Sequence, residues 1–187
     1  MSILLICGIL LFGLAHLFPA ACPGAHQTVI GKIGRNPYRG IFALIILAAL
    51  ILIVIGWRSS SVAIVYSPPE WGYLAAQVLM YPALFLFISA RANSNIKRII
   101  RHPQLTSVAL WGVAHLLANG ESRAALLFGG LAVWALGEIF FINRRDGAWR
   151  KPAAAPYSAD IKVAVIAVAV YAALAFGHDY FTGAPAF

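Results

Sequence analysis

Residues 101–120 read RHPQLTSVALWGVAHLLANG, a mostly apolar run that carries two of the chain's five histidines. The apolar part is close to the length that crosses a hydrocarbon core as a helix. His102 and His115 lie near its two ends. An ionisable side chain inside such a span usually faces other helices and has a partner there. This stretch therefore predicts a membrane helix with a polar site beside it.

The rest of the chain has the same character. Of its 187 residues, 61% are hydrophobic and 11% are charged, whereas soluble domains are about half apolar and a quarter charged. We therefore predict an all-α, integral membrane bundle of about six transmembrane helices, which forms a single domain over residues 1–187 and has the lipid bilayer as its surroundings. The predicted spans are residues 2–19, 40–57, 71–90, 104–119, 123–142 and 160–178. We interpret the first as a retained helix and not a cleaved signal peptide.

The formal charge of +8 gives the predicted orientation. The basic residues gather in the loops 20–39, 91–103 and 143–162, and basic loops stay on the cytoplasmic side. Both termini are then expected on the opposite side. No nucleic-acid-binding motif accompanies these charges, so no nucleic-acid partner is predicted.

Two interpretations of His115 follow from spacing. It shares one helical face with Trp111 and Asn119, four residues away on either side. It is either a buried neutral histidine bonded to Asn119 or to a backbone carbonyl, or an axial haem ligand whose second nitrogen is held by Asn119. His102 cannot bind the same iron, because the two lie about 20 Å apart along the helix and point about 140° apart. A second ligand must come from another helix, and His16 is the candidate within a span. His26 and His178 are expected outside the apolar runs.

Several blocks resemble the NnrU family of bacterial membrane proteins, which is named for a link to nitrite and nitric oxide metabolism. They are LAHLFP (14–19), NPYRG (36–40), the 101–120 stretch, and LLFGGLAVWALGEIFFINRRDG (126–147). The resemblance implies a bacterial inner-membrane protein, and with the charge pattern it places both termini in the periplasm.

The family is related to 15-cis-zeta-carotene isomerase, an integral membrane enzyme that contains haem b. This relation implies haem b bound by His16 and His115, and suggests isomerisation of an apolar polyene as an activity. A further histidine of the isomerase has no counterpart here, because Trp134 stands near its place. Straight helices would put His16 and His115 at heights that differ by roughly 10–15 Å, so His16 with His102 is the competing pair.

Other interpretations stay open at this point. Arg101-His102-Pro103 resembles an element of isoprenylcysteine carboxyl methyltransferases, where it would help to hold S-adenosylmethionine. Arg101 is also a candidate for binding haem propionates, with lipid headgroups as the default partner. A third hypothesis is an accessory or transport factor for denitrification without haem, in which His16 and His115 are only buried polar partners.

Two further predictions concern packing. Glu138 is expected to pair with Arg144 or Arg145 at the cytoplasmic boundary. Gly8 with Gly13, and Gly129 with Gly130, are predicted to let helices approach closely.

Overall fold

The computed structural model describes residues 3–183 and 186. The regular secondary structure of this part is helical apart from one isolated bridge between Ile64 and Glu121, and loops join the helices. It divides into two compact units. The first combines Met1–Ser67 with Asn119–Ala148, and the second combines Pro68–Ala118 with Trp149–Phe187. The single domain predicted for 1–187 stays a prediction.

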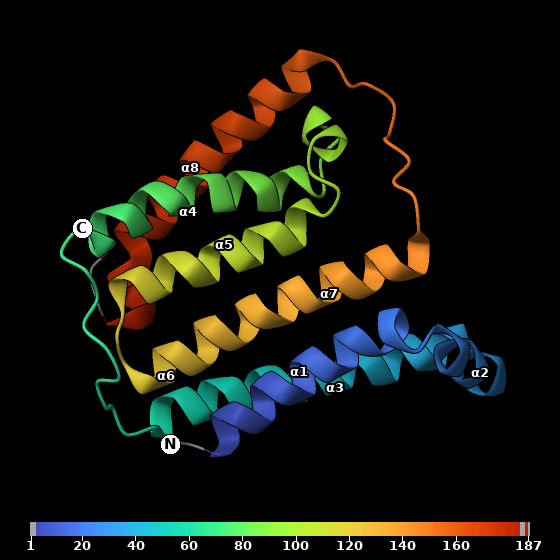
Figure 1. Ribbon diagram of the computed structural model, residues 1–187, viewed down its shortest axis with the longest axis horizontal. Helices are drawn as coiled ribbons and strands as arrows, with labels where there is room; N and C mark the ends of the chain where they lie inside the picture. Colours follow the sequence, from blue (N-terminus) through green and yellow to red (C-terminus); the bar gives the residue numbers. More distant parts are fainter. Residues whose placement is uncertain (1–2, 184–185, 187) are drawn as a thin grey trace. The chain divides into compact units, whose positions relative to one another are not determined.

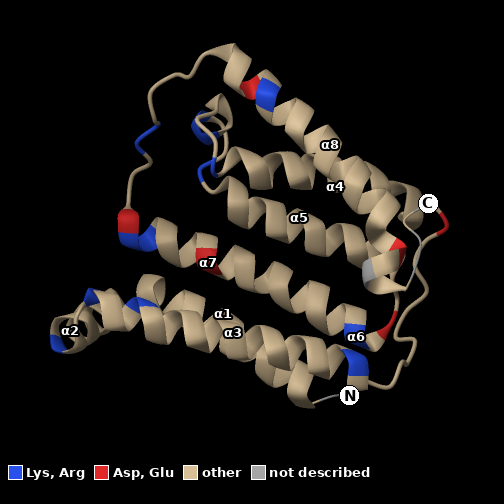
Figure 2. Cartoon of the chain, turned by 180° about the vertical axis from the view of Figure 1, so that it is seen from behind, with Lys and Arg blue, Asp and Glu red and all other residues tan. Residues whose placement is uncertain are grey.

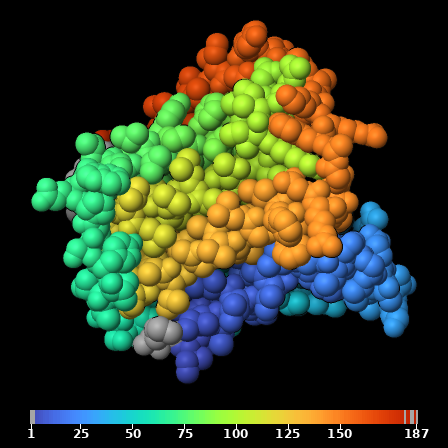
Figure 3. Space-filling view, in the orientation of Figure 1, coloured from blue at the N-terminus to red at the C-terminus, as the bar shows by residue number. Residues whose placement is uncertain are grey.

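The first unit is built around its N-terminal helix, which packs against α3 and against α7 (Figure 1). Its elements are α1 (Ile3–Ala21), α2 (Pro23–Ile33), α3 (Arg35–Ser59), α6 (Ser122–Ala124), the π-helical turn η2 (Ala125–Gly129) and α7 (Gly130–Asp146). The last three follow one another without a break and form one long apolar helix over Ser122–Asp146. Figure 3 shows side chains of α7 (orange) lying directly on those of α1 (blue).

Glycines set the spacing between α1 and its neighbours. A Cβ added at Gly56 would clash with the backbone of Leu5, and one at Gly8 would lie 2.7 Å from the backbone nitrogen of Ile53. Leu5 is fully buried at this crossing. On the other side, an added Cβ at Gly13 would lie 3.3 Å from Cδ1 of Trp134. The close packing predicted at Gly8 and Gly13 is confirmed.

Gly130 also belongs to the α1–α7 contact, since a Cβ there would lie 3.0 Å from Cγ2 of Ile9. Further along, Nη1 of Arg145 donates to the carbonyl oxygen of Pro19 at 3.3 Å. The contacts advance in the same order along both helices, so α1 and α7 run in the same direction. This agrees with their predicted places as the first and fifth spans.

Residues 63–66 and 119–122 pair with each other and complete the first unit; we call this pair of segments the strap. The backbone nitrogen of Val65 donates to the carbonyl oxygen of Gly120 at 2.9 Å, and that of Ser122 donates to Ala63 at 2.7 Å. The hydroxyl of Tyr66 donates to the carbonyl oxygen of Asn119 at 2.7 Å. The strap therefore ties the segment after α3 to the segment before α6.

The second unit is centred on α4, which packs against both α5 and α8. Its elements are α4 (Gly72–Ser89), the 3-10 turn η1 (Asn95–Arg98), α5 (Pro103–Ala118) and α8 (Tyr157–Thr182). A Cβ at Gly72 would clash with the carbonyl oxygen of Leu117, so α4 starts in close contact with the end of α5. The hydroxyl of Tyr171 in α8 donates to the carbonyl oxygen of Gln77 at 3.1 Å.

All six predicted spans are helices, and the chain is a multi-pass membrane protein. Five helices in the described part are long and apolar enough to cross a bilayer by themselves. The sixth predicted span, α5, has 16 residues, which reach about 24 Å against a core of about 30 Å. Figure 2 shows Lys and Arg (blue) mainly near helix ends and in connections. The helix α2, inside the predicted loop 20–39, was not predicted; Pro23 occupies its first turn.

Candidate functional site

His16 lies on α1 with one ring nitrogen engaged by the backbone. Its Nδ1 lies 2.9 Å from the carbonyl oxygen of Phe12, one turn earlier in the helix. A carbonyl oxygen only accepts hydrogen bonds, so Nδ1 carries the proton. In the neutral ring the lone pair is then on Nε2, which is the atom that can bind a metal.

Three helices of the first unit supply aromatic rings around His16. The ring centroid of Phe12 (α1) lies at 4.3 Å, and those of Phe42 (α3) and Trp134 (α7) lie at 5.2 Å. Trp134 meets both His16 and Phe12 edge-on. The residue that stands near the place of the isomerase's additional histidine is therefore part of the wall around His16.

His115, in the second unit, repeats the arrangement of His16. Its Nδ1 lies 2.9 Å from the carbonyl oxygen of Trp111, again one turn back, and the two rings are 5.0 Å apart. The neutral tautomer accordingly has its lone pair on Nε2. The acceptor for Nδ1 is thus a backbone carbonyl, which was one of the two predicted partners, and not the side chain of Asn119.

Asn119 itself lies one residue beyond the end of α5, which stops at Ala118. The expected common helical face of Trp111, His115 and Asn119 is therefore interrupted, because the third residue is no longer helical. Its carbonyl oxygen accepts the hydrogen bond from Tyr66.

His178 was expected outside the apolar runs, and this was wrong. The helix α8 continues to Thr182 and includes it. The hydroxyl of Thr182 donates to the carbonyl oxygen of His178 at 2.8 Å, and its oxygen lies 3.1 Å from Nδ1 of the same histidine. If that oxygen accepts the Nδ1 proton, the lone pair of His178 is also on Nε2. The imidazole lies near enough to His115 for the two rings to interact electrostatically. The four-residue spacing of His178 and Thr182 is the sequence signal that could have predicted this helical contact.

Arg101 and His102 immediately precede α5, with Pro103 as its first residue. The carbonyl oxygen of His102 accepts from the backbone nitrogen and the hydroxyl of Thr106, both at 2.9 Å. His102 and His115 thus lie at opposite ends of one helix. This agrees with the argument that they do not share an iron.

His16 belongs to the first unit, and His102, His115 and His178 belong to the second. The pairs His16–His115 and His16–His102 stay predictions. Among the described residues, no three His, Cys, Asp or Glu side chains gather as a metal site. Axial ligation of haem needs only two imidazoles and does not depend on such a cluster.

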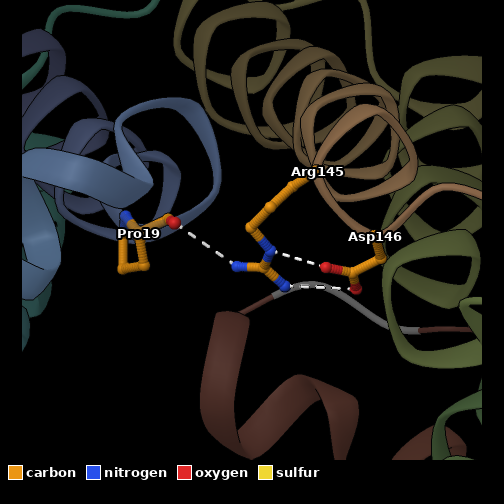
Figure 4. A network of polar contacts seen from close by, with 3 residues as sticks. All are labelled: Pro19, Arg145 and Asp146. Carbon is orange, nitrogen blue, oxygen red and sulfur yellow. Dashed lines mark hydrogen bonds and ion pairs between the residues drawn. The ribbon is translucent and has the colours of Figure 1, made fainter.

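Glu138 has a different environment from the one predicted. Arg145 directs Nε and Nη2 to the Asp146 carboxylate at 2.7 and 3.2 Å, and Nη1 to the Pro19 carbonyl (Figure 4). The predicted pairing of Glu138 with Arg145 was therefore wrong, because the neighbouring Asp146 and the end of α1 occupy this guanidinium. Glu138 is 9% exposed, and its Oε2 has no hydrogen-bond partner.

Comparison with known proteins identifies the family. The sequence pattern of the family described as NnrU protein matches residues 4–186, which is nearly the whole chain. No curated protein and no solved structure matched the chain. With that match and the helical membrane architecture described above, the chain belongs to the NnrU family.

Proposed function

We propose that this chain is a haem b protein of the bacterial inner membrane, with Nε2 of His16 and Nε2 of His115 as the axial ligands. The observation that carries the proposal is the shared geometry of the two histidines. In each, the backbone carbonyl four residues earlier holds Nδ1 at 2.9 Å and sets the tautomer that a metal requires. Aromatic rings line both sites, as suits an apolar porphyrin.

Haem would supply a redox-active iron with exchangeable axial ligands. The protein's own part is to fix the two imidazoles and to exclude water. We propose that this centre serves nitrite and nitric oxide metabolism as an accessory or sensor. The competing function is isomerisation of an apolar polyene dissolved in the membrane. We favour the accessory role because Trp134 stands near the place of the isomerase's additional histidine and packs on His16.

Absorption spectra of the detergent-purified full chain, oxidised and reduced, test the cofactor. We expect a Soret band after haem-replete expression. A colourless protein would contradict the proposal and favour the accessory or transport function without haem. Saturable binding of S-adenosylmethionine that depends on Arg101 and His102 would instead favour the methyltransferase interpretation.

Single histidine variants test the ligand set. His16→Ala and His115→Ala should each remove or shift the band, while His26→Ala, a change outside the predicted spans, should leave it intact. Loss in His102→Ala with retention in His115→Ala would favour the competing pair. Loss in His115→Ala and His178→Ala with retention in His16→Ala would place both ligands within the second unit and overturn the role of His16.

Exposure to nitric oxide separates the two functions. A sensor should change its reduced spectrum when nitric oxide is added, with no change in a carotenoid substrate. Conversion of a cis-carotenoid by the purified protein alone would favour the isomerase and contradict the accessory role.

A further inference from the structure

The α1–α7 contact carries an unusual polar feature. Gly130, Trp134 and Arg145 of α7 contact α1 at Ile9, Gly13 and Pro19 respectively. Glu138 lies one turn after Trp134 and two turns before Arg145, on the same helical face. Its place is therefore in this contact, at the height of the His16 turn. Figure 2 shows an acidic position (red) along α7, away from both helix ends.

Two polar atoms in this contact have no hydrogen bond of standard geometry. They are Oε2 of Glu138 and Nε1 of Trp134, and both are buried. The two side chains lie close enough for the indole N–H to interact with the carboxyl group, but no hydrogen bond of standard geometry joins Nε1 and Oε2. Leaving a buried polar atom without a partner costs about 1–3 kcal/mol, and the hydrocarbon around a membrane helix offers no bulk water in compensation. A pair of such atoms at one place indicates a ligand.

The chemistry of the two atoms specifies the ligand. An indole N–H only donates a hydrogen bond, while a carboxyl oxygen accepts one. A hydroxyl group does both, so one ligand oxygen can accept from Trp134 and donate to Glu138. A Cβ added at Gly137, the residue before Glu138, would meet nothing within 4 Å, so α7 has open space beside this residue. The rings of Phe12 and Trp134 make the neighbourhood apolar.

We propose that Nε1 of Trp134 and Oε2 of Glu138 bind the hydroxyl group of a neutral ligand at the α1–α7 contact. The hydroxyl belongs either to water or to an apolar alcohol dissolved in the membrane. All the residues involved lie within the first unit, and the site does not require haem.

Binding of a matched pair of probes tests whether the ligand is an alcohol. Radiolabelled farnesol, an isoprenoid alcohol, is compared with farnesane, the hydrocarbon without the hydroxyl, on the purified full chain. We expect saturable binding of farnesol alone, weakened about tenfold or more in Glu138→Leu and in Trp134→Phe, since each removes one buried hydrogen bond. Glu70→Leu and Trp71→Phe change exposed residues of the same types and should bind as the unchanged protein does. Glu138→Gln keeps an accepting oxygen and should retain binding.

Exchange of the Trp134 indole proton with D2O tests whether the ligand is water. The proton is assigned in nuclear magnetic resonance spectra by its absence in Trp134→Phe. If water is the ligand, farnesol shows no saturable binding, but the proton exchanges in the folded protein, and exchange slows about tenfold or more in Glu138→Leu. Helical circular dichroism and elution volume show that each variant is folded. Absence of both saturable farnesol binding and Glu138-dependent exchange overturns the proposal.

Discussion

A histidine in a membrane helix must satisfy two ring nitrogens without water, and here the backbone satisfies one of them. His16 and His115 each approach the carbonyl four residues earlier at 2.9 Å. That carbonyl oxygen is already an acceptor of the helix backbone, but its second lone pair is available for the imidazole N–H. The i, i−4 geometry thus selects one tautomer with no additional side chain. Because this hydrogen bond depends only on the local helix geometry, it forms in both units in the same way.

Gly56 provides a residue-scale prediction. In Gly56→Ala the new methyl would meet the backbone of Leu5, which cannot move without displacing α1. We expect a loss of about 3 kcal/mol in the free energy of unfolding, measured by thermal or denaturant unfolding in detergent. The matched control is Gly137→Ala, whose methyl meets nothing; it should be neutral or stabilising by up to about 1 kcal/mol. Equal stability of the two variants would show that α1 and α3 do not cross as closely as described.

At the scale of elements, side chains in connections join helices that are distant in sequence. The side chain of Asn95 donates to Asp160 at 2.6 Å and to the carbonyl oxygen of Ala155 at 2.8 Å, and accepts from the backbone nitrogen of Ala155 at 3.0 Å. The backbone nitrogen of Asn95 also donates to Asp160 at 2.8 Å. This arrangement joins the start of α8 to η1. In the first unit, the hydrogen bond from Tyr66 to Asn119 likewise joins the two segments of the strap.

Asn95→Ala should weaken the attachment of α8. The change removes three hydrogen bonds of the side chain, one of them to a carboxylate, and we expect a loss of about 2–3 kcal/mol. Protease sensitivity of the 147–156 connection in the folded protein measures the detachment, together with thermal unfolding. Asn93→Ala, an exposed position in the same connection, is the control. If both variants behave like the unchanged protein, Asn95 does not hold α8.

Tyr66→Phe should loosen the strap of the first unit. The hydroxyl donates to Asn119 at 2.7 Å, and burial raises the pKa of Tyr66, so it remains a donor at neutral pH. The phenylalanine variant should lose about 1 kcal/mol of stability, read from the unfolding midpoint. Tyr180→Phe alters a tyrosine that is 91% exposed and should have no effect. A matching loss in both variants would argue against a structural role of the hydrogen bond.

At the scale of the whole molecule, α5 differs from the other predicted spans because it is shorter. Basic residues lie before it and few follow it, which is the pattern of a crossing helix. The 16 residues of α5 correspond to 104–119, the shortest of the predicted spans. Local thinning of the bilayer at a short helix costs only fractions of a kcal/mol per Å.

Thiol labelling decides whether α5 crosses. In a background with Cys7 and Cys22 replaced by serine, Lys97→Cys and Glu121→Cys place one thiol on each side of α5. With six spans, a membrane-impermeant reagent added to cells with a permeable outer membrane should label position 121 and spare position 97 until the inner membrane is opened. Labelling of both positions from outside would mean that α5 does not cross and would change the predicted side of the C-terminus.

The sequence alone determined the class of this protein, the helices of its six predicted spans, and its family. Apolar content and run length are sufficient for this, because a helix in lipid must satisfy its backbone internally wherever it lies. The bond between His115 and the carbonyl four residues earlier is local in the same way, and a backbone carbonyl was one of the two predicted partners of His115. The sequence could not determine that α1 packs between α3 and α7, that Trp134 meets His16, or that Arg145 leaves Glu138 without its expected partner. Those facts depend on which helix faces meet, and that is decided by contacts between residues from 45 (Gly8 and Ile53) to 126 (Pro19 and Arg145) positions apart in the sequence.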